Sequence, residues 1–225
     1  MIACLIQDKN TSQIIEESAS RLAKSLGKTF QVAYIDDKVG ALSTYCEAND
    51  VSFLFIQLIE NKRGKIQKIL TACRDLRIPY LLFKNSFELL QTNKIVVPVN
   101  FLEEEVEKAQ FASAFGRFCH SEIYILQAND YGSKATTNVS RMCELFEKFS
   151  LKVHVEKAKS DSFKVEKEAL NKALEMNAGI ILITASREYG LDDILFGPKE
   201  LHLVQKSNLA LLIINPRADL YALCD

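Results

Sequence analysis

The chain has 225 residues, with 28 basic and 29 acidic side chains and a formal net charge of −1. Hydrophobic residues make up 48% and charged residues 25%, values typical of a globular protein with a sizeable core. The near-neutral charge excludes a dedicated nucleic-acid binder, which presents a basic surface. The longest apolar runs, such as residues 209–214, are far shorter than the roughly 18 residues of a membrane-spanning helix. We expect neither a nucleic acid nor a membrane as a partner.

The beginning of the chain and its cysteines both favour a cytoplasmic location. Residues 1–6 carry no basic segment and no small-residue cleavage site of the kind that marks a secretory signal. The six cysteines are scattered, with no C-x-x-C pair, so we expect reduced core thiols rather than disulfides. They are Cys4, Cys46, Cys73, Cys119, Cys143 and Cys224.

Strands and helices alternate along the first half of the chain. The first apolar run leads into a helix with Ile15, Ala19, Leu22 and Leu26 on one face, the spacing of an amphipathic helix. The pattern predicts strands at residues 2–6, 30–35, 51–56 and 80–83, and helices at 15–26, 42–48 and 66–76. Short apolar runs separated by helices predict βαβ units and a parallel sheet.

The second half continues the alternation with one more strand. Its pattern predicts strands at residues 95–99, 123–126, 152–155, 179–184 and 209–214, and helices at 111–119, 137–149, 165–176 and 199–206. Several of these strands are continuous apolar runs rich in Val and Ile, which suits strands buried on both faces. The expected class is therefore α/β, with parallel sheets.

The two halves resemble each other at a shift of 93 residues. Each begins with a strand, a helix and a strand, and each ends with an apolar helix, a polar break and a closing strand. We therefore expect two domains, residues 1–93 and 94–225, of which the first lacks one helix and one strand. The join at 85–93 contains Phe87, Leu89 and Leu90 rather than a Gly/Ser tether, so the halves are expected to pack together.

Residues 94–216 resemble the universal stress protein family. The segment 94–100, Lys-Ile-Val-Val-Pro-Val-Asn, is similar to the family's opening strand, 178–183 to its fourth strand and 209–215 to its ending. The first half resembles a shortened member, so the whole chain resembles a tandem universal stress protein. The resemblance implies two doubly wound parallel-sheet domains of the adenine nucleotide alpha hydrolase-like, Rossmann-like kind, with strand order 3-2-1-4-5.

In that order the missing piece of the first half is the outermost strand with its helix, a loss that leaves the centre of the sheet intact. The fifth strand of each half lies at an edge, and both are strongly apolar, which is an aggregation hazard unless the edge is covered. The family's homodimers pair through their closing strands. We therefore expect the two domains to pack through these edge strands as an intramolecular pseudo-dimer, with a homodimer of whole chains as a further option.

Many family members bind ATP in a loop after the fourth strand, with the pattern G-x2-G-x9-G-[ST], where glycines let the backbone approach the phosphates. That frame falls here on Thr184, Arg187, Gly197 and Pro198, with Gly190 as an additional glycine inside the loop. Only Gly197 matches. Pro198 has no backbone N–H and replaces a hydroxyl side chain, so a phosphate loses two donors.

A second departure from the family pattern lies at the end of the opening strand. There the family usually has an aspartate that contacts the nucleotide or its metal, and this chain has Asn100, whose neutral side chain binds a hard cation less well. In the first half, residues 57–64 hold a single glycine out of frame. We expect that half not to bind nucleotide in the family's manner.

Simpler interpretations stand beside these. Gly197 and Pro198 can mark a helix start, since proline is favoured at the first helical position, and Arg187 with Glu188 can be a solvated pair. The histidines His120, His154 and His202 have no metal-binding spacing, and no nucleophile-elbow pattern is present. We therefore expect no metal and no catalytic group.

These observations lead to one functional hypothesis and two alternatives. The first is a non-enzymatic, cytoplasmic stress-response protein with a degraded ATP-binding loop and no cofactor, acting through protein association or an unidentified small ligand. The second is an ATP-binding or slowly ATP-hydrolysing member that uses a variant loop, in which Arg187 compensates for the lost donors. The third is a regulatory module that acts on a transporter or kinase.

Overall fold

The structure is a computed structural model that describes residues 1–34, 42–186 and 198–216. Its contacts divide the chain into two compact units, Met1–Leu89 with Ala185–Asp225, and Leu90–Thr184. Among the described residues, no helix combines the length and the apolarity that crossing a membrane requires. The domain division expected from the repeat, 1–93 and 94–225, stays a prediction, because compact units are defined by packing and repeats by sequence.

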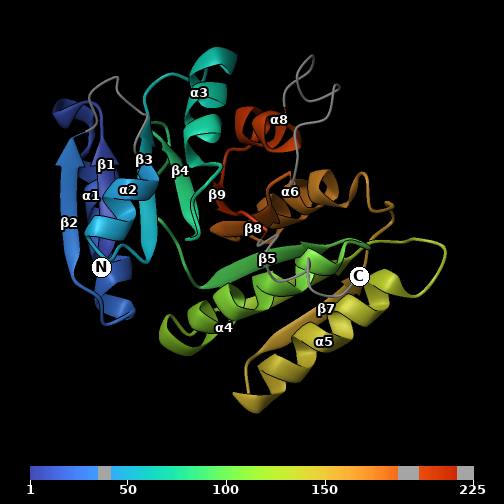
Figure 1. Ribbon diagram of the computed structural model, residues 1–225. Helices are drawn as coiled ribbons and strands as arrows, with labels where there is room; N and C mark the ends of the chain where they lie inside the picture. The colour runs from blue at the N-terminus through green and yellow to red at the C-terminus, as the bar shows by residue number, and fades with distance from the viewer. Residues whose placement is uncertain (35–41, 187–197, 217–225) are drawn as a thin grey trace. The chain divides into compact units, whose positions relative to one another are not determined.

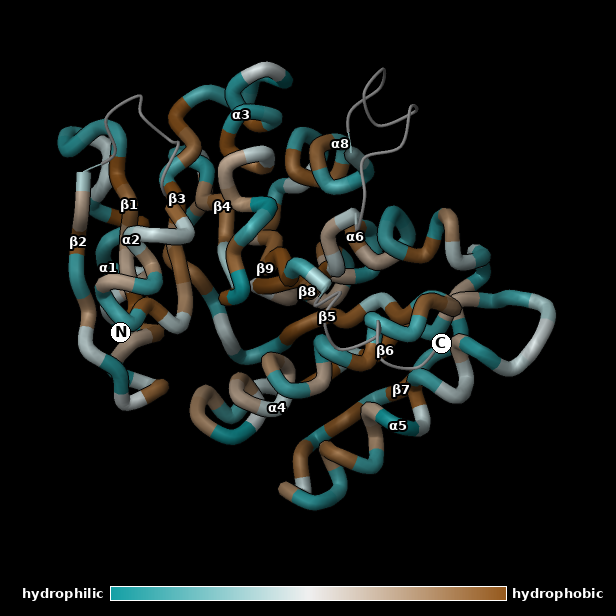
Figure 2. The backbone as a smooth tube through the Cα atoms, viewed as in Figure 1, coloured by the Kyte–Doolittle hydropathy of each residue, from teal (hydrophilic) through white to brown (hydrophobic). Residues whose placement is uncertain are grey.

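The first unit is a five-stranded sheet in the order β2-β1-β3-β4-β9 (Figure 1). Its strands are β1 (Ile2–Ile6), β2 (Phe30–Tyr34), β3 (Phe53–Leu58), β4 (Tyr80–Lys84) and β9 (Ala210–Ile214), and its helices are η1 (Lys9–Thr11), α1 (Gln13–Ser25), α2 (Leu42–Ala48), α3 (Arg63–Cys73) and α8 (Lys199–Lys206). Every residue of β1, β3, β4 and β9 is buried. These central strands are the continuous apolar runs of the sequence, and Figure 2 shows them largely in brown.

The closing strands of the two halves pair with each other inside this unit. β4 and β9 run antiparallel, with Tyr80 opposite Ile213 and Leu82 opposite Leu211, whereas the other described pairs of the unit are parallel. The pairing confirms the expectation that the halves pack through these strands. It also explains why both strands are so strongly apolar, since each is covered along its edge.

Each half also caps a helix of the other. The Nζ of Lys84, the last residue of β4, donates to the carbonyl oxygens of Ser207 at 2.7 Å and Gln205 at 3.2 Å, at the end of α8. The Nδ2 of Asn215, just after β9, donates to Cys73 O at 2.7 Å and Leu76 O at 2.9 Å, at the end of α3. The last carbonyls of a helix have no partner within it, so these bonds satisfy carbonyl groups that would otherwise lack a hydrogen-bond partner.

The second unit is a four-stranded parallel sheet in the order β8-β5-β6-β7. Its elements are β5 (Lys94–Val99), η3 (Glu103–Glu107), α4 (Lys108–Phe118), β6 (Glu122–Gln127), α5 (Lys134–Lys148), β7 (Val153–Lys157), α6 (Val165–Glu175) and β8 (Ile180–Thr184). Helices α4 and α5 lie side by side on one face of the sheet and α6 on the other (Figure 1). β7 is the edge strand, and four of its five residues are exposed.

Gly179 fixes the beginning of β8 against the segment that joins the halves. A Cβ at this position would lie 1.8 Å from the carbonyl oxygen of Gln91, far inside van der Waals contact. The Gly179 N–H donates to Lys94 O at 3.1 Å. Only glycine allows this close approach of two backbones.

Both strand orders agree with the fold expected from the resemblance. The second unit repeats the first four places of the order 3-2-1-4-5, and the first unit has β2-β1-β3-β4, which is that order without its outermost strand. The α/β fold class and the parallel sheets are therefore confirmed. Helix boundaries differ from the expected ones by about three residues at most, as at α4, which begins at Lys108 rather than at residue 111.

Candidate functional site

The candidate site lies at the carboxyl ends of β5 and β8 in the second unit. In doubly wound sheets the chain leaves the central strand in opposite directions, and ligands bind in the crevice at that switch point. Asn100 directly follows β5, and Thr184 is the last residue of β8. β5 pairs with β6 over six residues but with β8 only at Ile95 and Val96. The two strands therefore stop pairing before they reach the site.

Pro98 accounts for the short pairing of β5 with β8. Lys94 O accepts the N–H of Gly179, before β8, and Val99 O accepts the N–H of Ala128, after β6. Since these groups alternate along a strand, the backbone groups of Pro98 face β8. Proline has no N–H to donate there, so the ladder cannot continue through it.

A lysine replaces β8 as the partner of this part of β5. The Nζ of Lys108, the first residue of α4, donates to Pro98 O at 2.5 Å and to Glu105 Oε2 at 2.9 Å. The same carboxylate oxygen accepts the backbone N–H of Asn100 at 3.0 Å. Both side chains of the Lys108–Glu105 pair are 0% exposed. The backbone groups of β5 that face β8 are thus satisfied by a buried ion pair.

Asn100 uses its own polar groups inside the protein. Its Oδ1 accepts the N–H of Leu102 at 2.7 Å, the turn that an asparagine side chain commonly forms with the backbone two residues on. Its carbonyl oxygen accepts the Nδ2 of Asn138 at 3.0 Å, and Asn138 also donates to Leu102 O at 2.7 Å. With 4% of its surface exposed, Asn100 is a structural residue in this arrangement.

The other predicted positions divide into described and undescribed residues. Thr184 is 2% exposed, and its hydroxyl oxygen has no hydrogen-bond partner within the described segments. Pro198 is the N-cap of α8, which begins at Lys199. It therefore lies one residue before the first helical position, which the sequence had suggested for it. Arg187, Gly190 and Gly197, together with the rest of residues 187–197, lie outside the described residues.

Sequence analysis missed Glu200, a buried acidic residue of the first unit in the first turn of α8. Its side chain accepts the N–H of Ser186 at 3.1 Å on Oε1 and the hydroxyl of Ser186 at 3.0 Å on Oε2. Glu200 is 2% exposed, and burial raises its pKa above the usual range of a carboxyl. The sequence signal for Glu200 was its position in the first turn of the helix that begins after Pro198, where acidic residues are favoured.

The described part of the site does not fit magnesium and a triphosphate. Asn100 is neutral and internally bonded, and the buried Lys108–Glu105 pair lies beside it. Pro198, which has no N–H to offer, belongs to the first unit. Asn100, Glu105 and Lys108 bond to one another and to Pro98 within the second unit. The sequence had indicated the substitutions at 100 and 198 but not the ion pair.

The corresponding place in the first unit is also filled by its own side chains. Gln57, fully buried in β3 near its end, accepts the N–H groups of Gln7 at 2.8 Å and Asp8 at 3.0 Å. Its amide nitrogen donates to Asp8 O at 3.2 Å and to Asn85 Oδ1 at 3.1 Å. A cavity of about 160 Å³ lies nearby, smaller than the roughly 300 Å³ at which ligand pockets begin.

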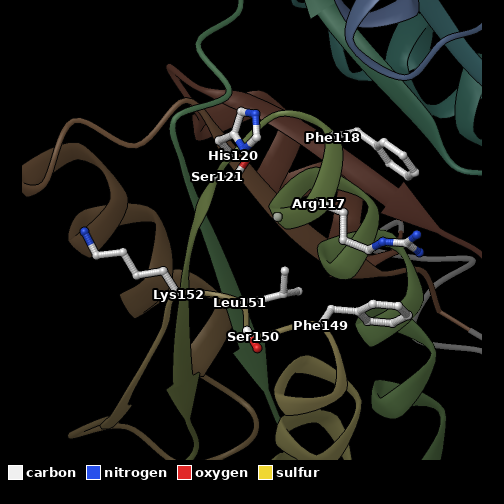
Figure 3. A pocket seen from close by; sticks show the side chains of 9 residues that line it. Arg117, Phe118, His120, Ser121, Phe149, Ser150, Leu151 and Lys152 are labelled. Atoms are coloured by element: carbon white, nitrogen blue, oxygen red, sulfur yellow. The ribbon is translucent and has the colours of Figure 1, made fainter.

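A larger cavity of about 520 Å³ lies at the opposite, amino-terminal ends of β6 and β7 (Figure 3). On one side Arg117 lies over two aromatic rings, 4.2 Å from the centroid of Phe149 and 4.9 Å from that of Phe118. His120 and Ser150, which end the turns after α4 and α5, have left-handed backbones with φ of 55° and 51°. The cavity is open and does not include Asn100. The guanidinium group of Arg117 is already stacked on aromatic rings.

The histidines and acidic residues in the described segments form no group of three that could hold a metal ion. His154 stacks on Tyr124 with ring centroids 4.5 Å apart, and its Nε2 lies 3.7 Å from the Glu122 carboxylate. Burial raises the pKa of Cys4 to about 12 and that of Cys46 to about 11. These thiols are therefore poor nucleophiles at neutral pH.

Fold and site together define an α/β protein with doubly wound parallel sheets, the Rossmann-like fold of the universal stress proteins. No family model and no curated protein matches the sequence. Among solved structures, the chain is similar to a universal stress protein from Archaeoglobus fulgidus, with a TM-score of 0.68, 16% identity and coverage of 96% of this chain and 97% of that one.

Two Pseudomonas aeruginosa structures are also similar. One is a protein of unknown function, with a TM-score of 0.55, 12% identity and coverage of 95% of this chain and 81% of that one. The other, provisionally assigned to the universal stress proteins, has a TM-score of 0.54, 12% identity and coverage of 96% and 81%. At these sequence identities the similarity establishes the fold, and function has to be inferred from the site residues.

Proposed function

We propose that this chain is a tandem universal stress protein whose nucleotide site is degraded and which works without catalysis. Its first copy is shortened, and the two copies form an intramolecular pseudo-dimer through β4 and β9. The protein then acts in the cytoplasm, in a stress response, by associating with another protein or by binding a small ligand other than ATP. The sheet pairing and the strand orders support the tandem arrangement.

The observation that carries this proposal is the buried Lys108–Glu105 pair at the switch point of the second unit. A nucleotide-binding site needs donors that are free to turn toward phosphate. Here the Lys108 ammonium is committed to Pro98 O and to the Glu105 carboxylate, and the N–H of Asn100 is bonded to the same carboxylate. Bringing a further anion next to Glu105 adds repulsion in a place of low dielectric.

The test is a titration of the purified full chain with Mg-ATP by isothermal calorimetry, together with analysis of the purified protein for nucleotide that copurifies. We expect no copurified nucleotide and no binding below about 1 mM. Micromolar binding would overturn the proposal in favour of a variant-loop nucleotide binder. In that case Arg187→Ala, which removes the cation suggested to compensate for the lost donors, should abolish binding.

A matched variant tests whether the altered loop residues account for the expected lack of nucleotide binding. The quadruple substitution Asn100→Asp, Thr184→Gly, Arg187→Gly and Pro198→Ser restores the family pattern at the departing positions. If the degraded loop is the main defect, this variant gains affinity for Mg-ATP relative to the natural chain. If it folds and gains none, the buried pair alone closes the site.

A further inference from the structure

The outer edge of β7 is an unpaired strand edge in the second unit. β7 pairs with β6 over five residues, from Val153 with Ile123 to Lys157 with Gln127. On its other side, no strand in the described part of the chain pairs with it. A bare strand edge is a template for pairing with another chain unless its side chains prevent it.

The hydrogen bonds along β6 establish which backbone groups of β7 point outward. The N–H of Ile123 donates to Lys152 O, and the N–H of Ala158 donates to Gln127 O. Because neighbouring residues of a strand alternate in direction, the even-numbered residues 152–158 face β6. The N–H and C=O groups of Val153, Val155 and Lys157 therefore point away from the sheet.

These outward residues are spaced for pairing with an identical strand. In an antiparallel pair, a residue with outward groups can exchange two hydrogen bonds with the residue opposite it. A twofold axis through Val155 sets Val155 opposite its copy, and sets Val153 opposite Lys157. All three outward positions of each strand then form hydrogen-bonded pairs, with no residue left over.

The same register sets a histidine, which is charged only when protonated, opposite a carboxylate. His154 falls opposite Glu156 of the second copy, and Glu156 opposite His154 of the second copy. These are the pairs without hydrogen bonds between them, whose side chains approach most closely. A pairing centred on Glu156 would set this residue opposite its own copy, and one centred on His154 would set Lys157 opposite Leu151, outside β7. Only the register centred on Val155 avoids like charges and also keeps all three outward residues paired within the strand.

The side chains concerned are accessible at this edge. Val155 is 50% exposed, a large apolar side chain open to solvent. The side chains of His154 and Glu156 are 47% and 58% exposed. Glu156 also receives Lys172 of α6 at 2.8 Å, but a carboxylate has acceptor sites beyond those that one ammonium group occupies.

We propose that two copies of this chain pair antiparallel along β7, about a twofold axis at Val155, and extend the sheet of the second unit across the dimer. The other described edge, β2, lacks this property, since its sequence Phe-Gln-Val-Ala-Tyr contains no charge to set the register. A symmetric contact also closes on itself and does not propagate into fibres. A single strand pair buries little surface, so the dimer should be weak, with a Kd on the order of 10–100 µM.

Sedimentation velocity on the full chain, over concentrations up to about 500 µM, tests this proposal. We expect a reversible monomer–dimer equilibrium that Val155→Pro abolishes, because proline removes the outward N–H at the axis. Proline is tolerated on an edge strand where the N–H faces solvent, so circular dichroism should show an intact fold. The matched control is Val32→Pro on β2, where the N–H also points outward, and it should leave the equilibrium unchanged.

Charge exchange supplies a second test that does not depend on proline. His154→Glu sets two carboxylates opposite each other at two symmetric places, and Glu156→Lys sets a lysine opposite the histidine in place of a carboxylate. Each should weaken the dimer by about tenfold or more. The double variant His154→Glu, Glu156→Lys restores opposite charges and should recover most of the affinity. A natural chain that stays monomeric throughout the range, a dimer lost in Val32→Pro but kept in Val155→Pro, or a double variant no better than the singles would each overturn the proposal.

Discussion

Replacing Lys108 by methionine tests the part played by the buried pair more directly than any ligand experiment. Methionine keeps most of the length and volume of lysine but removes the ammonium group that bonds Pro98 O and Glu105. Since both side chains are 0% exposed, water cannot compensate for the lost charge. Breaking a buried pair by removing one partner costs about 3–5 kcal/mol.

That cost converts into a shift that calorimetry measures easily. For a chain of this size, 1 kcal/mol changes Tm by about 2–4 °C, so Lys108→Met should lower Tm by about 6–20 °C. The cost should shrink from pH 8 to pH 5, because a carboxylate left without its lysine can bind a proton. The double variant Glu105→Gln, Lys108→Met should recover part of the loss, since the amide oxygen introduced at position 105 can still accept the N–H of Asn100.

The control for this prediction is an exposed pair in the same unit. Lys152 pairs with Glu122, but the lysine side chain is 64% exposed, and exposed pairs contribute about 0–1 kcal/mol. Lys152→Met should therefore change Tm little. If Lys108→Met proved as mild as Lys152→Met, or its cost did not depend on pH, the claim that an ion pair holds the switch point closed would be refuted.

Three further predictions concern buried polar groups and thiols. Burial raises the pKa of Glu200, so the stability that this carboxyl contributes is present below its unfolded pKa and is lost as pH rises through its folded pKa. In urea unfolding, Glu200→Gln should therefore gain stability relative to the natural chain from pH 4 to pH 8. Free energies of unfolding that change with pH in parallel for the two proteins would contradict this. Lys84→Met, which uncaps α8, should cost about 1–3 kcal/mol in the same assay, and an unchanged midpoint would refute the capping role. Partly exposed Cys119 should react with a thiol reagent in the folded protein, whereas buried Cys4 should react only after unfolding, and equal rates in the folded state would count against the described packing.

The sequence predicted the elements of this fold because their apolar pattern is set by burial in a sheet between helices. The nine expected strands all lie where the pattern placed them. Helix starts were less predictable, since α3, α4 and α5 each begin three residues before the predicted position. α4 begins at Lys108, inside a run of charges that resembles a solvated loop, because its first side chain is held by tertiary contacts rather than by helix periodicity. Pairing of β4 with β9 was predictable, since two strongly apolar edge strands require a cover.

The candidate site was predicted in part. The substitutions at 100 and 198 were visible because they change the donors that a phosphate needs, whereas the pair that closes the switch point was not. Its signal was Pro98 near the end of a central strand, where a missing N–H predicts a local break in the ladder and a carbonyl that needs another donor. Which lysine supplies that donor depends on where a helix begins, and helix ends are the least certain feature of a sequence.

The exchange of caps between the halves explains why the compact units differ from the sequence repeat. α8 lies in the second half of the sequence, yet its last carbonyls are held by Lys84 of the first half, while α3 of the first half is held by Asn215 of the second. Together with the β4–β9 pairing, these bonds tie residues 198–216 to the first half of the chain. β9 pairs with β4 at the edge of the sheet opposite β2 and so covers this apolar strand. The shortened copy is therefore expected to be unstable when expressed alone as residues 1–93, because β4 would then end the sheet as a bare apolar edge.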